Sequence, residues 1–254
     1  MRARLPISVL LLARDEVSDL EALLPTLDFA SEVVLVWDPR GDVRVRLLAE
    51  QLGARVIEHV FEGFGAQRAF ALSACREPWV LWIDADERLD REASESLPRA
   101  LEAGDARAYE IARRTWFLGA PIRFCGWQGE SVLRLFPRLA ASFDDAAVHE
   151  EVRLEGVSVE RWPGRIEHHS YATWERCVEK PRAYAHLAAA EAHREGRRAS
   201  LLDLLWRPPL RFLRQYVLQL GVLDGARGLL VSSLGAWQVF LKYGELWASS
   251  RARR

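Results

Sequence analysis

The stretch Trp79-Val80-Leu81-Trp82-Ile83-Asp84-Ala85-Asp86-Glu87 is an apolar run that ends in an Asp-x-Asp pair. Its apolar residues predict a strand that is buried on both faces. Because Asp84 and Asp86 follow the carboxyl end of that strand, their like charges repel unless a cation joins them. Carboxylate oxygens select Mg2+ or Mn2+, which leave coordination positions open for phosphate oxygens. The alternative is an ordinary turn in which Asp90 caps a helix over residues 91–101.

The sequence before this run alternates short apolar segments with amphipathic ones. Strands are expected at residues 7–12, 33–37 and 55–58, and helices at 19–27, 43–52 and 66–75. This alternation over short loops predicts crossover connections and a mostly parallel sheet, hence an α/β fold. Ligands of such sheets bind beyond the carboxyl ends of the strands. Residues 14–16 and Asp38 should therefore lie at the same edge of the sheet as Asp84 and Asp86.

The second half of the chain has a different pattern. Strands and irregular loops are expected from residue 109 to about 169, and helices dominate after residue 173. The helical segments are residues 183–194, 201–220 and 222–247, with breaks at Pro208-Pro209 and Gly221. We therefore predict an α/β domain over residues 1–170 and a helical region over 171–254.

Composition excludes several classes of protein. The net charge of the 254 residues is -1, which provides no global basic field for nucleic acid. Three widely spaced cysteines, Cys75, Cys125 and Cys177, indicate neither a zinc site nor a disulfide framework, and favour a reducing cytoplasm. Charged residues at 14–16 follow the first apolar run where a signal peptide would be cleaved, so that run is expected to be a strand.

The order of these segments resembles glycosyltransferase family 2, most closely the branch of lipopolysaccharide core-biosynthesis glucosyltransferases. The similarity runs from residues 7–16 through Asp38, residues 63–72 and residues 84–88. Beyond them it includes Gly126-Trp127, Arg134-Leu135-Phe136, His149-Glu150, His168-His169-Ser170-Tyr171, Ala199-Ser200, Leu223-Asp224-Gly225 and residues 239–243. It therefore covers almost the whole chain.

The resemblance implies a GT-A fold, a Rossmann-like nucleotide-diphospho-sugar transferase sheet with a C-terminal helical extension. It also implies a nucleotide-sugar donor, most often a UDP-sugar, an Mg2+ or Mn2+ cofactor, and inversion at the anomeric carbon. By this resemblance Asp86 binds the metal beside Asp84, with His149 as an extra ligand. The residues expected at the nucleotide sugar are Arg14, Glu16, Asp38, Gln67, Arg68, Asp84 and Arg134.

An inverting transfer also needs a base on the face opposite the leaving group, to take the proton of the acceptor hydroxyl. Glu130 aligns with the carboxylate that follows the Gly-Trp pair of the family, and Glu150 is the second candidate. The expected acceptor is a glycan or glycolipid similar to the lipopolysaccharide core. A polyprenyl-phosphate acceptor, which needs no strong base, is the rival enzyme reading.

Departures from the family pattern concern mainly the donor site. Asp15 stands where Asn is common, and Pro39-Arg40-Gly41-Asp42 replaces a Ser/Gly/Thr-rich loop that ends in Asp. Ala66 and Ala69 occupy positions where Lys and Asn are usual, and Glu130 replaces Asp. The altered loop after Asp38 is the one feature that supports a different class of protein, a degenerate member that acts as a binding scaffold.

The C-terminal helices combine aromatic and basic side chains. They carry Trp206, Phe212, Tyr216, Trp237, Phe240, Tyr243 and Trp247 together with Arg207, Arg211, Arg214 and Arg227. This mixture suits a lipid interface, so the protein is expected in the cytoplasm and on the inner face of the cell membrane. Packing against the catalytic domain, or against a second subunit in a homodimer, accounts for the same pattern equally well.

Overall fold

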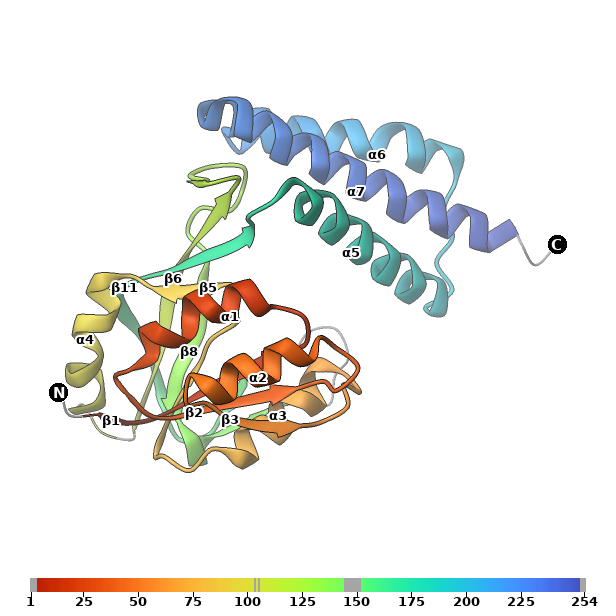
Figure 1. Cartoon of the computed structure of the whole chain (residues 1–254). Helices are drawn as coiled ribbons and strands as arrows, with labels where there is room; N and C mark the ends of the chain where they lie inside the picture. Colours follow the sequence, from red (N-terminus) through yellow and green to blue (C-terminus); the bar gives the residue numbers. More distant parts are fainter. Residues whose placement is uncertain (1–3, 103, 105, 144–151, 252–254) are drawn as a thin grey trace. The chain divides into compact units, whose positions relative to one another are not determined.

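The computed structural model of the chain describes residues 4–102, 104, 106–143 and 152–251, which form two compact units (Figure 1). The first unit comprises Met1–Arg113 and Glu130–His168, and the second comprises Arg114–Gly129 and His169–Arg254. Residues 114–129 thus belong with the helical unit, although they lie inside the segment 1–170 in sequence. The predicted α/β fold, with a mostly parallel sheet and C-terminal helices, is confirmed.

The main sheet has the strand order β3-β2-β1-β4-β8-β6-β11-β5. Its parallel half consists of β3 (Arg55–Glu58), β2 (Ala30–Trp37), β1 (Leu5–Ala13) and β4 (Trp79–Trp82). The other half adds β8 (Ser131–Pro137), β6 (Arg107–Phe117), β11 (Ser158–Tyr171) and β5 (Glu87–Leu89), with antiparallel pairs at β4–β8, β6–β8 and β11–β5. A short β7 (Ala120–Pro121) pairs with β6, and β9 (Ala141–Phe143) pairs with β10 (Val152–Leu154).

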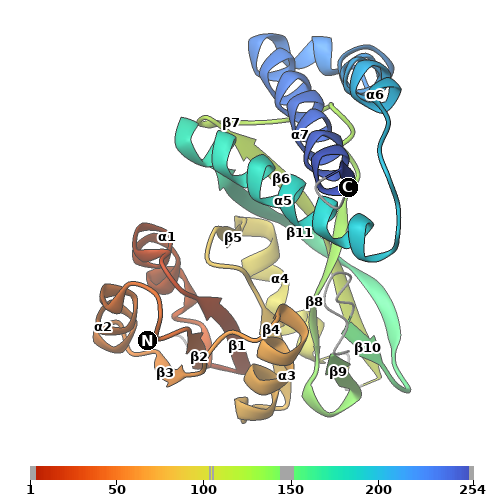
Figure 2. The ribbon, with the colours of Figure 1, turned by 90° about the vertical axis from the view of Figure 1, so that its right-hand side faces the viewer.

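Consecutive residues of β1, β2 and β4 are apolar and point to opposite faces of the sheet. Both faces are therefore covered by helices. The helices of the first unit are α1 (Val17–Leu23), a 3-10 turn at Leu24–Leu27, α2 (Val43–Gln51), α3 (Phe64–Ala74) and α4 (Arg91–Glu102). Leu20 of α1, Val45 of α2 and Leu97 of α4 share one buried cluster with Val9, whereas α3 packs on the opposite face. Figure 2 shows α1 and α2 on one side of the sheet and α3 on the other.

The second unit is built around three helices, α5 (Trp174–Arg194), α6 (Leu201–Leu213) and α7 (Gly225–Arg251). Helix α7 packs against both α5 and α6. A π-helical turn, η3 (Arg214–Leu218), and a 3-10 turn, η4 (Gly221–Asp224), connect α6 to α7. Ser200 and Asp203 form a capping box that begins α6, because each side chain accepts a hydrogen bond from the backbone N–H of the other.

The break expected at Pro208-Pro209 is wrong, because α6 continues through both prolines to Leu213. A proline ring holds φ near the helical value, so the helix can continue although the carbonyls of Leu204 and Leu205 lose their N–H partners. No single helix in the described part of the chain is long and apolar enough to cross a membrane. Only the pair Leu201–Leu218 and Gly221–Arg251, bent by 73°, meets the length and composition of a span.

Candidate active site

Three loops meet at the carboxyl edge of the parallel strands, as the sequence predicts. They follow β1, β2 and β4, which are neighbours in the order β2-β1-β4. The amide of Asp38 donates to the carbonyl of Ala13 at 3.2 Å, and the amide of Asp42 donates to the carbonyl of Arg14 at 3.0 Å. A Cβ at Gly41 would lie 2.3 Å from that same Arg14 oxygen, so only glycine fits there. The loops after β1 and β2 are thereby fixed against each other.

The Asp-x-Asp pair lies at this edge, and its first member is held by an arginine. Arg134 Nη2 donates to Asp84 Oδ2 at 2.7 Å and to Glu87 Oε1 at 2.6 Å. The Arg134 and Glu87 side chains are buried, whereas 36% of the Asp84 side chain is exposed. The Asp84 amide also donates to Glu87 Oε2 at 3.1 Å. Glu87, which the sequence places in the loop after this strand without a role of its own, is therefore the buried carboxylate that orients Arg134 and the start of the loop.

Burial and charge act against each other in this cluster. Burial raises the pKa of Asp84, but the positive charges of Arg134 and Arg68 together lower it by more, so the pKa is below its usual value. Burial raises the pKa of Glu87 above its usual value, even though Arg134 opposes the shift. Burial lowers the pKa of Arg134, but the two carboxylates raise it by more. Asp84 is consequently an anion and Arg134 a cation at neutral pH.

Trp82, at the end of β4, lies beside two of the arginines that are expected at the nucleotide sugar. The Arg68 guanidinium carbon lies 4.1 Å from the Trp82 ring centroid, and that of Arg134 lies 4.5 Å from it. Each cation is favoured by the negative face of the indole. Arg68 comes from α3 and Arg134 from β8, so the ring brings together side chains from distant parts of the sequence at the Asp84 loop.

Asp86 has a histidine beside it. Asp86 Oδ2 lies 3.5 Å from His168 Nε2, and both side chains are mostly buried, with 19% and 14% exposed. His168 is on β11, where it pairs in register with Glu87 of β5. In the sequence, the run His168-His169-Ser170-Tyr171 signals an imidazole, but nothing local indicates which carboxylate it meets.

Glu130, the predicted base, is the far end of a row of alternating charges. Both of its oxygens accept from Arg113, with Nε at 3.2 Å from Oε2 and Nη2 on Oε1. Arg113 Nη1 in turn lies 3.6 Å from Glu87 Oε1. The row Glu130, Arg113, Glu87, Arg134 and Asp84 therefore links the predicted base to the Asp-x-Asp pair.

Asp38, the predicted nucleoside contact, is buried and clamped by the loop that departs from the family pattern. Arg40 donates from Nε to Oδ1 at 2.9 Å and from Nη2 to Oδ2 at 2.6 Å. Arg40 Nη2 also donates to the carbonyl of Phe61 at 2.9 Å. These hydrogen bonds lower the pKa of Asp38 to about 2, although burial opposes the shift.

The substitution Arg40→Ala should therefore raise the pKa of Asp38 from about 2 toward its ordinary value of 3.8. Because this pKa is depressed in the folded protein, its contribution to stability is present above about pH 4 and is lost as the pH falls toward 2. NMR titration of the Asp38 carboxyl carbon measures the shift. Arg44→Ala is the matched control, since Arg44 grips Asp42 with the same geometry and should leave Asp38 unchanged. An Asp38 pKa that stays near 2 without Arg40 contradicts the assignment.

The other predicted donor-site residues are placed differently from one another. Arg14 is exposed at the edge, with Nε 3.3 Å from Asp15 Oδ2. Glu16 accepts from the amides of Arg14 and Asp15 at 2.7 and 2.9 Å, which shapes the loop after β1. Gln67 is buried and bonds twice to His59, through Nε2 to the carbonyl and through Oε1 to Nδ1. Gln67 thus fixes the segment that precedes α3.

His149 and Glu150, the predicted extra ligand and alternative base, lie outside the described residues. Among the residues that are described, no group of three or more His, Cys, Asp or Glu side chains is arranged to hold a metal. A divalent ion at Asp86 would therefore need oxygen ligands from a donor or from water, which is how Mg2+ is usually bound.

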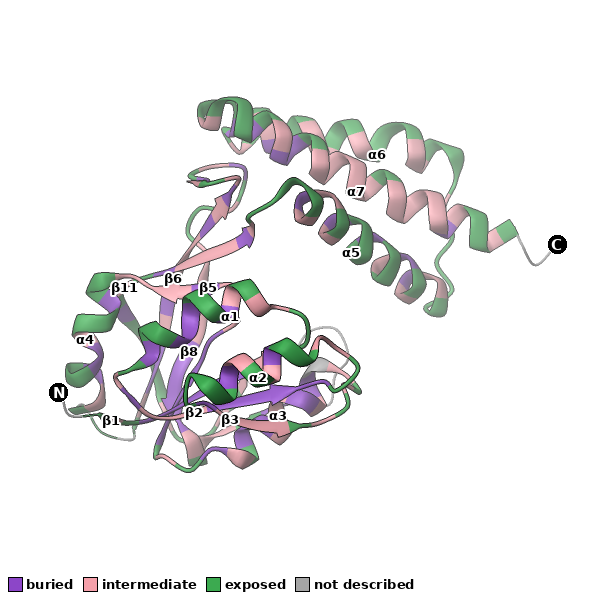
Figure 3. Cartoon of the chain, in the orientation of Figure 1, coloured by how far each residue is buried: buried purple, intermediate pink, exposed green. Residues whose placement is uncertain are grey.

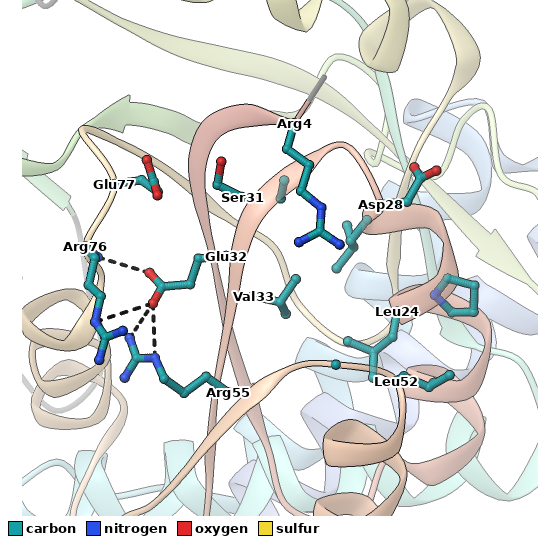
Figure 4. A pocket seen from close by; sticks show the side chains of 14 residues that line it. Arg4, Leu24, Asp28, Ser31, Glu32, Val33, Leu52, Arg55, Arg76 and Glu77 are labelled. Carbon is teal, nitrogen blue, oxygen red and sulfur yellow. Dashed lines mark hydrogen bonds and ion pairs between the residues drawn. The ribbon is translucent and has the colours of Figure 1, made fainter. Parts of the chain in front are cut away.

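A hollow of about 500 Å³ lies at the opposite, amino-terminal edge of β1 and β2 (Figure 4). Its lining includes Glu32, Arg55 and Arg76. Glu32 accepts from Arg55 Nη2 at 2.7 Å, from the Arg76 amide at 3.0 Å and from Ser8 Oγ at 2.6 Å. Glu32 is already paired with Arg55, and the Asp84 loop follows the other end of the strands, so this hollow is separate from the candidate site.

Comparison with known proteins gives consistent findings. Residues 20–120 match the family model of glycosyl transferase family 2. The chain is 29% identical over 258 residues to the lipopolysaccharide core biosynthesis glycosyltransferase LpsC of Rhizobium meliloti (strain 1021), covering 97% of this chain and 94% of that protein. It is 24% identical over 259 residues to the uncharacterized glycosyltransferase RT0209 of Rickettsia typhi, covering 94% and 86%.

Solved structures are more distant. One is glucosyl-3-phosphoglycerate synthase from Mycobacterium tuberculosis in complex with Mn2+, UDP and glucosyl-3-phosphoglycerate. It is 18% identical, with a TM-score of 0.43, and the match covers 76% of this chain and 81% of that one.

Proposed function

We propose that this chain, which matches the family model of glycosyl transferase family 2 over residues 20–120, is a glycosyltransferase of that family and moves a sugar, with inversion, from a nucleoside-diphosphate donor to a hydroxyl group. The observation that carries the proposal is the carboxyl edge of β1, β2 and β4, where Asp86 and His168 lie next to the Arg134–Asp84 pair. The expected donor is a UDP-sugar. The expected acceptor is a glycan or glycolipid of the lipopolysaccharide core type, because the relative LpsC carries that description.

The donor atoms at Asp86 fit a divalent cation. A carboxylate oxygen and an imidazole nitrogen lie 3.5 Å apart, close enough for both to reach one metal ion. Mg2+ and Mn2+ commonly take few protein ligands and complete their shell with phosphate oxygens and water. Such an ion would stabilise the negative charge that develops on the leaving nucleoside diphosphate.

The arginines of the site can share that task. Arg68 and Arg134 present guanidinium groups at the same loop, and guanidinium groups bind phosphate oxygens with two parallel hydrogen bonds. Arg134 is already held by Glu87, so it needs little reorganisation to stabilise charge. Asp84 would hold Arg134 in place until the diphosphate arrives.

Glu130 is the proposed base for the acceptor hydroxyl. Its side chain is 40% exposed, so an acceptor can reach it, and Arg113 orients its carboxylate. Each oxygen has a second lone pair beside the one that accepts from Arg113, and that lone pair can take the proton of the acceptor hydroxyl. A phosphate acceptor, which is already anionic, would not require this step.

Glu130→Gln should therefore lower kcat with a hydroxyl acceptor by about a hundredfold, because glutamine keeps the shape but cannot take a proton. The measurement is nucleoside-diphosphate release from a panel of nucleotide sugars, with glycolipid and polyprenyl-phosphate acceptors. Glu110→Gln on the same strand as Arg113 is the control and should retain activity. Unchanged turnover with every hydroxyl acceptor would remove Glu130 as the base, and transfer to polyprenyl phosphate alone would establish the rival function.

A further inference from the structure

The outward side of α6 is apolar over its whole length. Leu201, Leu202, Leu205, Trp206, Leu210 and Leu213 are each more than half exposed. Their spacing of one, three and four residues places them on one side of a helix. In Figure 3 most of α6 is coloured as exposed. An isolated exposed leucine is ordinary, but a continuous row of them along one helix indicates a surface that meets something apolar.

The rest of α6 faces α7. Arg207 lies over the Tyr243 ring at 4.6 Å, and Leu204 Cδ2 would lie 3.7 Å from a Cβ at Gly244. Arg211 of α6 and Gln215 of η3 lie one and two turns after Arg207, and a Cβ at Gly235 of α7 would meet both of their side chains. Leu204, Arg207, Arg211 and Gln215 are spaced by three and four residues, so they form a single side. The exposed apolar side is therefore not the one that packs within the unit.

Positive charge borders the apolar side. Residues 196–218 contain five arginines and one acidic residue, Asp203, which gives five minus one, or +4, in a chain whose net charge is -1. Asp203 is already paired with Arg207 at 2.6 Å. Arg198 and Arg214 remain exposed at either end of the helix. An apolar side bordered by arginine suits a layer that combines acyl chains with phosphate headgroups.

We propose that the outer side of α6 binds the surface of an anionic lipid bilayer, with the helix lying in the plane of the headgroups. At 13 residues, α6 is about 20 Å long, too short to cross a hydrocarbon core of about 30 Å. Charge favours lipid over a second copy of the chain, because two copies would bring two regions of +4 together. The proposal depends on α6 alone and stands whether or not the proposed transfer reaction is correct.

The test uses the full chain with a dye at residue 210. Cys75, Cys125 and Cys177 are all buried, so in Leu210→Cys a thiol-reactive environment-sensitive dye labels the new site selectively. Vesicles of phosphatidylcholine with about one quarter phosphatidylglycerol should shift the dye emission to shorter wavelength, and pure phosphatidylcholine should bind at least about tenfold more weakly. The same dye at Leu139→Cys, a position 87% exposed in the other unit, should not respond.

Leu205→Asp should weaken vesicle binding about tenfold or more in sedimentation, whereas Leu139→Asp should not. Both positions are exposed, and the thermal unfolding midpoint of each variant verifies that it is folded. Arg198→Glu with Arg214→Glu should abolish the preference for anionic vesicles. A dye at residue 210 that ignores both kinds of vesicle overturns the proposal. So does a dimer, measured by light scattering, that Leu205→Asp converts to a monomer without vesicle binding, since the α6 side would then join two copies.

Discussion

Asp86→Ala should lower kcat by about a thousandfold while leaving the fold intact. The metal proposed at Asp86 would provide several kcal/mol of charge stabilisation in the transition state, and about 4 kcal/mol corresponds to a thousandfold in rate. Asp86 is one of two anions that favour the Arg88 cation, and without it Arg88 keeps Asp19 and its hydrogen bonds to the carbonyls of Ala85, Glu87 and Asp19. Stability should therefore change by less than about 1 kcal/mol.

The measurement combines turnover with calorimetry. In the unmodified chain, UDP should bind with Mn2+ present and much more weakly with EDTA, and in Asp86→Ala this difference should vanish. His168→Ala should reduce activity by about ten- to a hundredfold, because the ion keeps its carboxylate but loses the imidazole. Asp42→Ala is the matched control, since Asp42 lies at the same carboxyl edge of the sheet but forms an ion pair with Arg44. Full activity of the Asp86 variant, or of the enzyme in EDTA, would rule out the metal.

Arg134→Met should lower the free energy of unfolding by about 3–5 kcal/mol, because the buried Glu87 loses the guanidinium at 2.6 Å and keeps that of Arg113 at 3.6 Å. Methionine fills much of the space of the arginine stem, so the loss reports the charge more than a cavity. Denaturant unfolding measures it. Arg91→Met is the control: the Arg91 side chain is 89% exposed and pairs with Glu95 on the surface, so the change should stay within about 0.5 kcal/mol.

The pH dependence of the Arg134 variant identifies the cause. Burial already raises the pKa of Glu87, and loss of Arg134 removes the main influence that lowers it. A carboxyl whose pKa is raised on folding favours the folded state at low pH and loses that contribution as the pH rises through the folded pKa. The deficit should thus be smaller at about pH 5 than at about pH 8. Adding Glu87→Gln should restore part of the stability at pH 8, and a deficit independent of both changes would point to packing instead.

The parallel sheet and its ligand edge could be predicted because they depend on local periodicity. Strand–helix alternation indicated parallel strands, and the carboxyl-end rule then placed Asp38, Asp84 and Asp86 at one edge, whereas the order β2-β1-β4 came from the structure. The continuation of α6 through Pro208-Pro209 was not predicted, because a proline lacks an N–H group and usually breaks a helix. The φ angle of proline is nevertheless compatible with a helix, and α6 continues.

Side-chain partners could not be predicted where they depend on long-range pairing. His168 reaches Asp86 because β11 pairs with β5 in a register that sets His168 opposite Glu87. No periodicity within either segment fixes that register, which is shared by residues far apart in the chain. The Arg40 clamp on Asp38 is local, but the same residues also read as an ordinary turn.

The row of alternating charges from Glu130 to Asp84 has an energetic consequence. Arg113 and Arg134 each divide their attraction between two anions, and both share Glu87. Neutralising one terminal carboxylate lets its arginine turn wholly to Glu87, which alters the field felt at the opposite terminus. Substitutions at Glu130 and Asp84 should consequently be non-additive, so neither residue has an energetic contribution that can be quoted without stating what occupies the other position.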